Sequence, residues 1–253
     1  MNTSIATAAV TRANREALEA ERLFFPGVAL VILVSVFVGF ARSYYLAGVF
    51  RAPLPNLLVH VHGAVFSLWI LLFAVQIGLA ASGRVAFHKR LGLIGFCLAV
   101  CVVILGLWTA TNSMNRHYAA GESGVGVRAF YAVPVTAMLS FSSLALFGYL
   151  KRNDPVVHKR LMLIATIALL DAAFARWPIA AAWWDLRIAQ LSCYFLLVLL
   201  ACYDLWFWRR IHRVTVLAGA ILIFLQQSAH LLGHTTAWQS FAAWAHSGFK
   251  FMN

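Results

Sequence analysis

Histidines with basic neighbours are the residues of this sequence best suited to chemistry. The tetrapeptide His88-Lys89-Arg90-Leu91 has a near copy in His158-Lys159-Arg160-Leu161, and each copy opens a long apolar run. Neutral imidazoles can ligate a haem iron from the two sides of the macrocycle. The adjacent Lys and Arg side chains are suited to neutralising the haem propionates. We therefore expect His88 and His158 to hold one haem b between them.

A second set of histidines lies in two other apolar runs. His60 and His62 begin one run, and His230 and His234 end another. His230 and His234 are spaced i,i+4 and share one helix face, whereas His60 and His62 lie about 200° apart, so that only one points inward. A second haem would then take one ligand from His60 or His62 and one from His230 or His234, and we expect these to be His62 and His230. The same four histidines could instead hold zinc or copper, or could be structural groups that bond lipid phosphate, water or neighbouring helices.

Asp171 is a carboxyl near the middle of an apolar run. A charged side chain at that depth in a bilayer is costly, so it marks a functional site by default. We expect Asp171 to act as a proton relay. The alternative is a structural pair with Arg176, or with an amide such as Gln226 or Gln227.

The elements that must position these residues are membrane-spanning helices. The chain of 253 residues is 62% hydrophobic and 11% charged, against about 25% charged residues in soluble domains. Seven runs approach the ~20 apolar residues that span a bilayer. They are Leu23–Tyr44, Leu57–Ala81, Leu91–Thr111, Phe130–Leu150, Leu161–Ala182, Ile188–Phe207 and Val214–Leu232. We expect an all-α polytopic membrane protein: a polar N-terminal segment (1–22), a seven-helix domain (23–234) and an amphipathic interfacial tail (235–253).

Lysine and arginine predict how this bundle is oriented. Of the 20 Lys and Arg residues, 13 lie at the N-terminus or between runs two and three, four and five, and six and seven, and 7 lie on the other side. The richer side faces the cytoplasm, so the N-terminus is expected inside and the C-terminus outside. Because the net charge of +12 arises in these loops, we expect anionic lipids as partners and no nucleic acid.

Three short motifs follow one another in a fixed order. His62 lies in an early apolar run, and His88-Lys89-Arg90-Leu91-Gly92 forms the first loop motif. The second, His158-Lys159-Arg160-Leu161-Met162, leads to Arg176. In this order they resemble the pattern of a family of uncharacterised bacterial integral membrane proteins, which have an early His, then His-Arg-x-Leu-Gly and then His-Arg-x-x-Met.

The resemblance covers roughly residues 57–180 and has two departures. Lys replaces Arg after each loop histidine, and Asp171 stands where an apolar residue is expected. The resemblance implies a multi-pass protein of the bacterial inner membrane and implies no reaction. A looser likeness to cytochrome b561-type proteins rests on paired histidines at opposite leaflets alone, which is an analogy of layout.

Three functional hypotheses follow. The first is a b-type haem protein for transmembrane or quinone-linked electron transfer, with a quinone or a redox protein as partner. The second is a non-catalytic membrane protein, a small transporter or an accessory subunit, in which the histidines are structural. The third is a metal-dependent intramembrane hydrolase. The third apolar run lacks the Asp or Glu that such a metal site would use, which counts against the third hypothesis.

Overall fold

The computed structural model describes residues 2–53, 55–122, 124–178 and 186–248, with side chains from Glu19 onward except at 186 and 187. These residues form helices and no strands, which confirms the all-α prediction. The helices are α1 (Asn2–Phe40) continued by the π-helical turn η1 (Ala41–Tyr45), α2 (Leu57–Ala81), α3 (Val85–Ala119), α4 (Val125–Leu150), α5 (Pro155–Ile167), α6 (Asp171–Phe174), α8 (Leu186–Trp208), α9 (Arg213–Gly233) and α10 (Thr236–Gly248).

Six of the described helices are long and apolar enough to cross a bilayer. They comprise Glu19–Tyr45, Leu57–Ala81, Val85–Ala119, Val125–Leu150, Ile188–Trp208 and Arg213–Gly233. Their outward faces are apolar, as in α2, where Leu68, Leu71 and Val75 are half exposed. Contiguous apolar surface of this extent is not stable in water. The architecture is therefore that of a multi-pass membrane protein.

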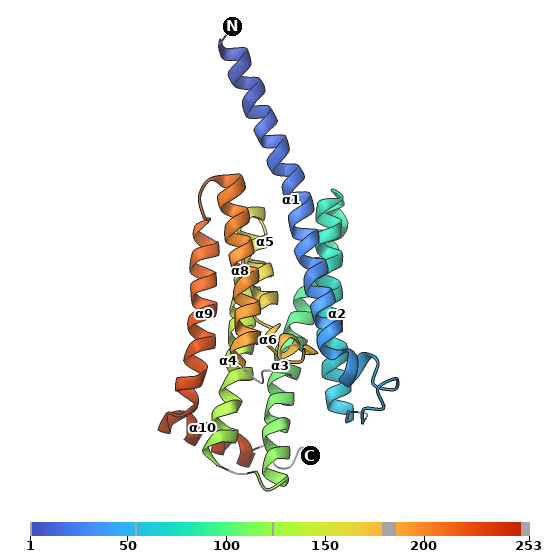
Figure 1. The fold of residues 1–253 in the computed structure, drawn as a ribbon, viewed down its shortest axis with the longest axis vertical. Coiled ribbons are helices and arrows are strands. Elements are labelled where there is room, and N and C mark those ends of the chain that lie inside the picture. Colours follow the sequence, from blue (N-terminus) through green and yellow to red (C-terminus); the bar gives the residue numbers. More distant parts are fainter. Residues whose placement is uncertain (1, 54, 123, 179–185, 249–253) are drawn as a thin grey trace.

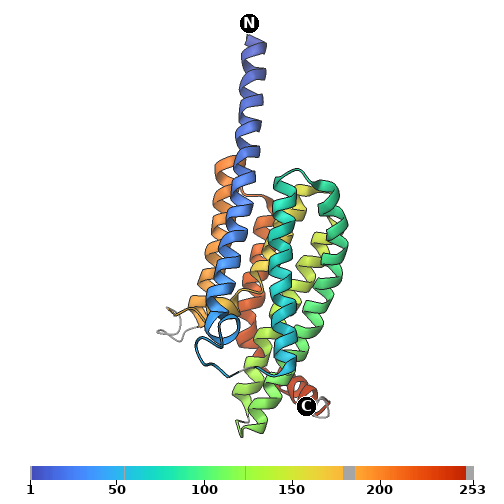
Figure 2. The same ribbon diagram turned by 90° about the vertical axis from the view of Figure 1, so that its right-hand side faces the viewer.

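The helices run up and down between two ends of the bundle (Figure 1). The start of α1 projects beyond one end, where the α2–α3, α4–α5 and α8–α9 turns also lie; we call this the N-terminal end. The short helix α10 lies across the other, the α10 end (Figure 2). In α10, Trp238, Ala242 and Ala245 are buried while Phe241 and Trp244 are exposed. One face of α10 therefore packs on the bundle and the other carries exposed aromatic side chains; the predicted interfacial position of this tail stays a prediction.

The fifth apolar run differs from the sequence prediction. We expected one helix over Leu161–Ala182, but α5 ends at Ile167 and α6 begins only at Asp171; residues 179–185 lie outside the described part of the chain. The helix α5 is buried inside the bundle, where Ile164 and Ile167 are both 0% exposed, whereas α6 and the residues after it are partly exposed. A broken helix is tolerated at membrane depth when surrounding protein, rather than lipid, meets its backbone. The break places the half-buried Asp171 at the start of α6, against α8 and α9.

The first apolar run is continuous with the polar segment before it. One helix, α1, covers both, and Pro26 lies within it. Close backbone packing holds the end of this helix in the bundle: a Cβ atom built on Gly39 would lie 2.3 Å from the carbonyl oxygen of Ala173 in α6. Only glycine permits this approach, so α1 is seated directly on the segment that carries Asp171.

Candidate functional site

The two loop histidines of the repeated tetrapeptide meet at the N-terminal end of the bundle. His88, in the first turn of α3, and His158, in the first turn of α5, have ring centroids 6.1 Å apart and ring planes at 85°. Each helix follows a short turn from the helix before it, so the same local geometry is used twice. The structure therefore brings together the pair that the repeat predicted.

Both imidazoles are anchored by a backbone carbonyl of the preceding helix. His88 Nδ1 lies 3.2 Å from the carbonyl oxygen of Gln76, and His158 Nδ1 lies 2.8 Å from that of Gly148. A carbonyl oxygen only accepts, so each Nδ1 carries the hydrogen and each Nε2 keeps its lone pair in the neutral ring. Burial lowers the pKa of His158 below its usual value, and the neighbouring His88 lowers it further. Neutral His158 is the form that can ligate a metal.

The basic residues beside the two histidines are not equivalent. Lys89 and Arg90, in the first copy, are exposed. In the second copy, Lys159 forms an ion pair with Glu21 of α1, and Arg160 is completely buried. Only the first copy therefore presents cations to an anionic group at this end, in contrast to the expectation that both copies would do so.

Arg160 is held by a buried carboxylate that sequence reasoning did not assign to it. The Arg160 guanidinium donates to both oxygens of Asp204 in α8, and neither side chain is exposed. Asp204 Oδ2 also accepts from Thr215 Oγ1 at 2.6 Å and from the backbone nitrogen of His212 at 3.0 Å. A hydrogen-bonded buried pair of this kind is a structural lock between helices. It joins α5, α8 and the start of α9.

The histidines expected at the other end do not converge. His60 and His62 lie on α2, and His230 and His234 lie on α9. These two helices are at opposite sides of the bundle (Figure 1), since α2 packs chiefly on α1 and α3 while α9 packs chiefly on α4. The His62 ring instead contacts Phe66, with centroids 4.0 Å apart. No group of three or more His, Cys, Asp or Glu side chains gathers anywhere in the described ranges.

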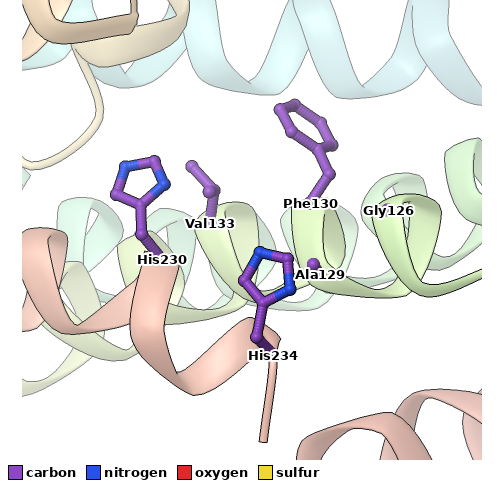
Figure 3. Close-up of a pocket in the computed structure, with 6 residues that line it drawn as sticks. All are labelled: Gly126, Ala129, Phe130, Val133, His230 and His234. Atoms are coloured by element: carbon purple, nitrogen blue, oxygen red, sulfur yellow. The ribbon is translucent and has the colours of Figure 1, made fainter.

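His230 and His234 line a groove between α9 and α4 near the α10 end. The groove has a volume of about 190 Å³, and its α4 wall is formed by Gly126, Ala129, Phe130 and Val133. Figure 3 shows the His230 ring beside Val133 and the His234 ring beside Ala129. Both histidines are exposed. A mostly apolar groove with two imidazoles is suited to water, a proton or a small polar group.

Asp171 is bonded to two neighbouring helices. Its Oδ2 accepts from Gln226 Nε2 of α9 at 2.7 Å, and its Oδ1 accepts from Cys193 Sγ of α8 at 3.0 Å. Arg176 points elsewhere: its guanidinium donates to the Ala172 carbonyl oxygen at 2.6 Å and lies over a ring of α1. The structural alternative that paired Asp171 with an amide is confirmed for Gln226, and the pairing with Arg176 is wrong.

A second amide cluster lies next to this carboxyl. Gln227 Nε2 donates to Gln190 Oε1 at 3.2 Å and to the hydroxyl of Tyr194 at 2.8 Å. Gln190 Nε2 lies 3.4 Å from His230 Nε2, so this cluster leads from the interior to the groove. The sequence signal was available: Gln226, Gln227 and His230 are spaced i, i+1 and i+4 in one apolar run.

Comparisons with known proteins add no identity to these observations. No family model, no curated protein and no solved structure matches the chain. The function is therefore inferred from the described side chains themselves.

Proposed function

We propose that this chain is an electron-transfer protein of the bacterial inner membrane that holds a haem iron between His88 and His158. The observation that carries the proposal is the pair of imidazoles 6.1 Å apart, each with its Nδ1 anchored on a backbone carbonyl. The proposal includes seven crossings, the fifth made by α5 and α6 together. The N-terminal end then faces the cytoplasm, as its lysines and arginines favour.

The geometry of the pair fits iron ligation from two sides. Two imidazoles that bind one metal have ring centroids within about 6 Å of each other, because each nitrogen–metal bond is about 2 Å long. The separation of His88 and His158 agrees with this spacing. An Nδ1–H bonded to a carbonyl is also the usual arrangement for a ligating histidine, since it fixes the tautomer and the ring orientation. Nε2 is then the donor atom in both rings.

The surroundings supply what an anionic cofactor would need. Lys89 and Arg90 are exposed beside the pair and are suited to binding carboxylates such as haem propionates. Haem would supply one-electron chemistry, and the chain would supply ligands, orientation and a largely apolar environment. A quinone or a redox protein is the proposed partner, and Asp171 is the proposed carrier of the accompanying proton.

The test is optical. We expect the full-length protein, purified after expression with sufficient haem, to show a reduced-minus-oxidised difference spectrum of the b type. His88→Ala and His158→Ala should each abolish the band, because one imidazole no longer completes the iron coordination. His117→Ala is the matched control, since that histidine is exposed and pairs with Glu122. A colourless wild-type protein that stays colourless when haem is added would refute the proposal.

A further inference from the structure

We infer that the groove between α4 and α9 is the entrance of a proton pathway that runs past His230 to Asp171 and is open to the α10 end only. The inference deepens the proton role proposed above for Asp171. It does not depend on haem, because the pathway and the His88–His158 pair lie towards opposite ends of the bundle.

The Asp171 carboxyl is the inner end of the pathway. Among the described residues, the ionisable groups facing the Asp171 carboxyl are Cys193 and Tyr194 from α8 and His230 from α9. Arg176, on the same segment, is directed at a carbonyl instead. A carboxylate that is partly removed from water and has no bonded cation is costly, and taking up a proton removes that cost. Asp171 is thus placed to exist as a neutral acid and to exchange its proton.

Gln226 can serve both states of this carboxyl. Its Nε2 donates to Asp171 Oδ2, while its buried Oε1 finds no partner in the described part of the chain. If the amide turns over, Oε1 accepts a hydrogen bond from the protonated acid. The two orientations of an amide differ little in shape. The Gln226 side chain can therefore hydrogen-bond Asp171 both when the carboxyl is ionised and when it is protonated.

The route from the groove to Asp171 follows one face of α9. Gln226, His230 and His234 are spaced i, i+4 and i+8 along one face of α9, which orders them from the interior to the groove. Gln190 bonds both the His230 ring and Gln227. Amides do not carry protons, so the carriers are the imidazoles and water. A groove of about 190 Å³ has room for several water molecules.

Apolar side chains close the pathway towards the N-terminal end. Helices α5, α8 and α9 each carry apolar residues that are 0% exposed. These residues lie between Asp171 and the buried pair Arg160–Asp204. They are Ile164 and Ile167 in α5, Leu200 in α8 and Leu222 in α9. A dry apolar layer offers no partners to water. This apolar layer therefore separates Asp171 from the N-terminal end. The proton of Asp171 can then exchange with water only through the groove.

The experiment follows the carbonyl stretch of protonated Asp171 by infrared difference spectroscopy on the full-length protein in lipid nanodiscs. The band is assigned by its loss in Asp171→Asn, which keeps the side-chain shape. After transfer to heavy water, the band shifts as the proton exchanges. His230→Phe should slow this exchange about a hundredfold, the lower end of what one positioned proton carrier contributes. His60→Phe, at the same end but on α2, should leave the rate unchanged.

Two further measurements test the entrance and the closed side. Zn²⁺ should slow the exchange in the wild type, because His230 and His234 are spaced to bind it, and should have no effect in His234→Ala. In oriented proteoliposomes, a pH change should alter the band from the α10 side only. A wild-type exchange rate in His230→Phe, a response from the N-terminal side, or no Asp171-dependent band would each overturn the inference. None of these outcomes bears on the haem spectrum.

Discussion

Arg160 and Asp204 form an ion pair that is completely buried and joins α5 to α8. The equivalent arginine of the first tetrapeptide, Arg90, is exposed. The two copies of the repeat thus share the anchored histidine and differ in the arginine. In the second copy the arginine serves the fold, because a buried guanidinium is stable only when its charge and its N–H groups are matched.

Removing one partner of this pair should destabilise the protein strongly. Asp204→Ala leaves an unpaired buried guanidinium and should cost about 3–5 kcal/mol of unfolding free energy. The measurement is reversible unfolding in detergent micelles. Arg90→Ala, an exposed site, should change stability by less than ~0.5 kcal/mol. The double variant Arg160→Met with Asp204→Leu should recover most of the loss, and a double variant as unstable as Asp204→Ala would contradict this explanation.

The close packing of α1 on α6 predicts that Gly→Ala substitutions at two positions of α1 change the stability in opposite directions. Gly39→Ala forces the Ala173 backbone away and should destabilise by about 1–3 kcal/mol. Gly27→Ala meets no atom within 4 Å and should stabilise by roughly 0.5–1 kcal/mol, since alanine is the better helix former. Thermal unfolding of the two variants side by side gives the comparison. Equal effects at the two positions would show that the close approach is not required.

The burial of His158 predicts a pH-dependent stability. Its pKa in the folded protein lies below the unfolded value of 6.5, so the unfolded state binds the proton more readily. The resulting stability is fully present above the unfolded pKa and is lost as pH falls from there towards the folded pKa. We expect the thermal midpoint of the haem-free protein to fall on acidification below about pH 6.5, less so in His158→Gln. A His158→Gln variant that keeps the full wild-type pH dependence would contradict this explanation.

The contacts of Asp171 predict which partner it is coupled to. A double-mutant cycle between Asp171→Leu and Gln226→Leu should give a coupling of about 1 kcal/mol, typical of one hydrogen bond. The same cycle with Arg176→Met should give a coupling near zero, because Arg176 bonds a backbone carbonyl instead. Unfolding free energies of the single and double variants are the measurement. Strong coupling to Arg176 would place the carboxyl in a different pairing.

Much of the layout was predictable because it depends on local composition. Apolar runs of bilayer length determine where helices form and that lipid surrounds them. The tetrapeptide repeat at the start of two helices predicted the pairing of His88 and His158, and the packing of the bundle brings the two rings together. The i,i+4 spacing of His230 and His234 places them on one face, whatever packs against it.

The sequence by itself therefore determined an all-helical membrane bundle, a histidine at the start of each of two helices and a carboxyl at Asp171. Only the tertiary structure decided that Arg160 pairs with Asp204, that the fifth run breaks before Asp171, and that α2 and α9 stand too far apart for His62 to meet His230. These outcomes depend on which helices touch. That choice is made by close fits such as Gly39 against Ala173, which involve residues distant in sequence and leave no periodic signal within either run.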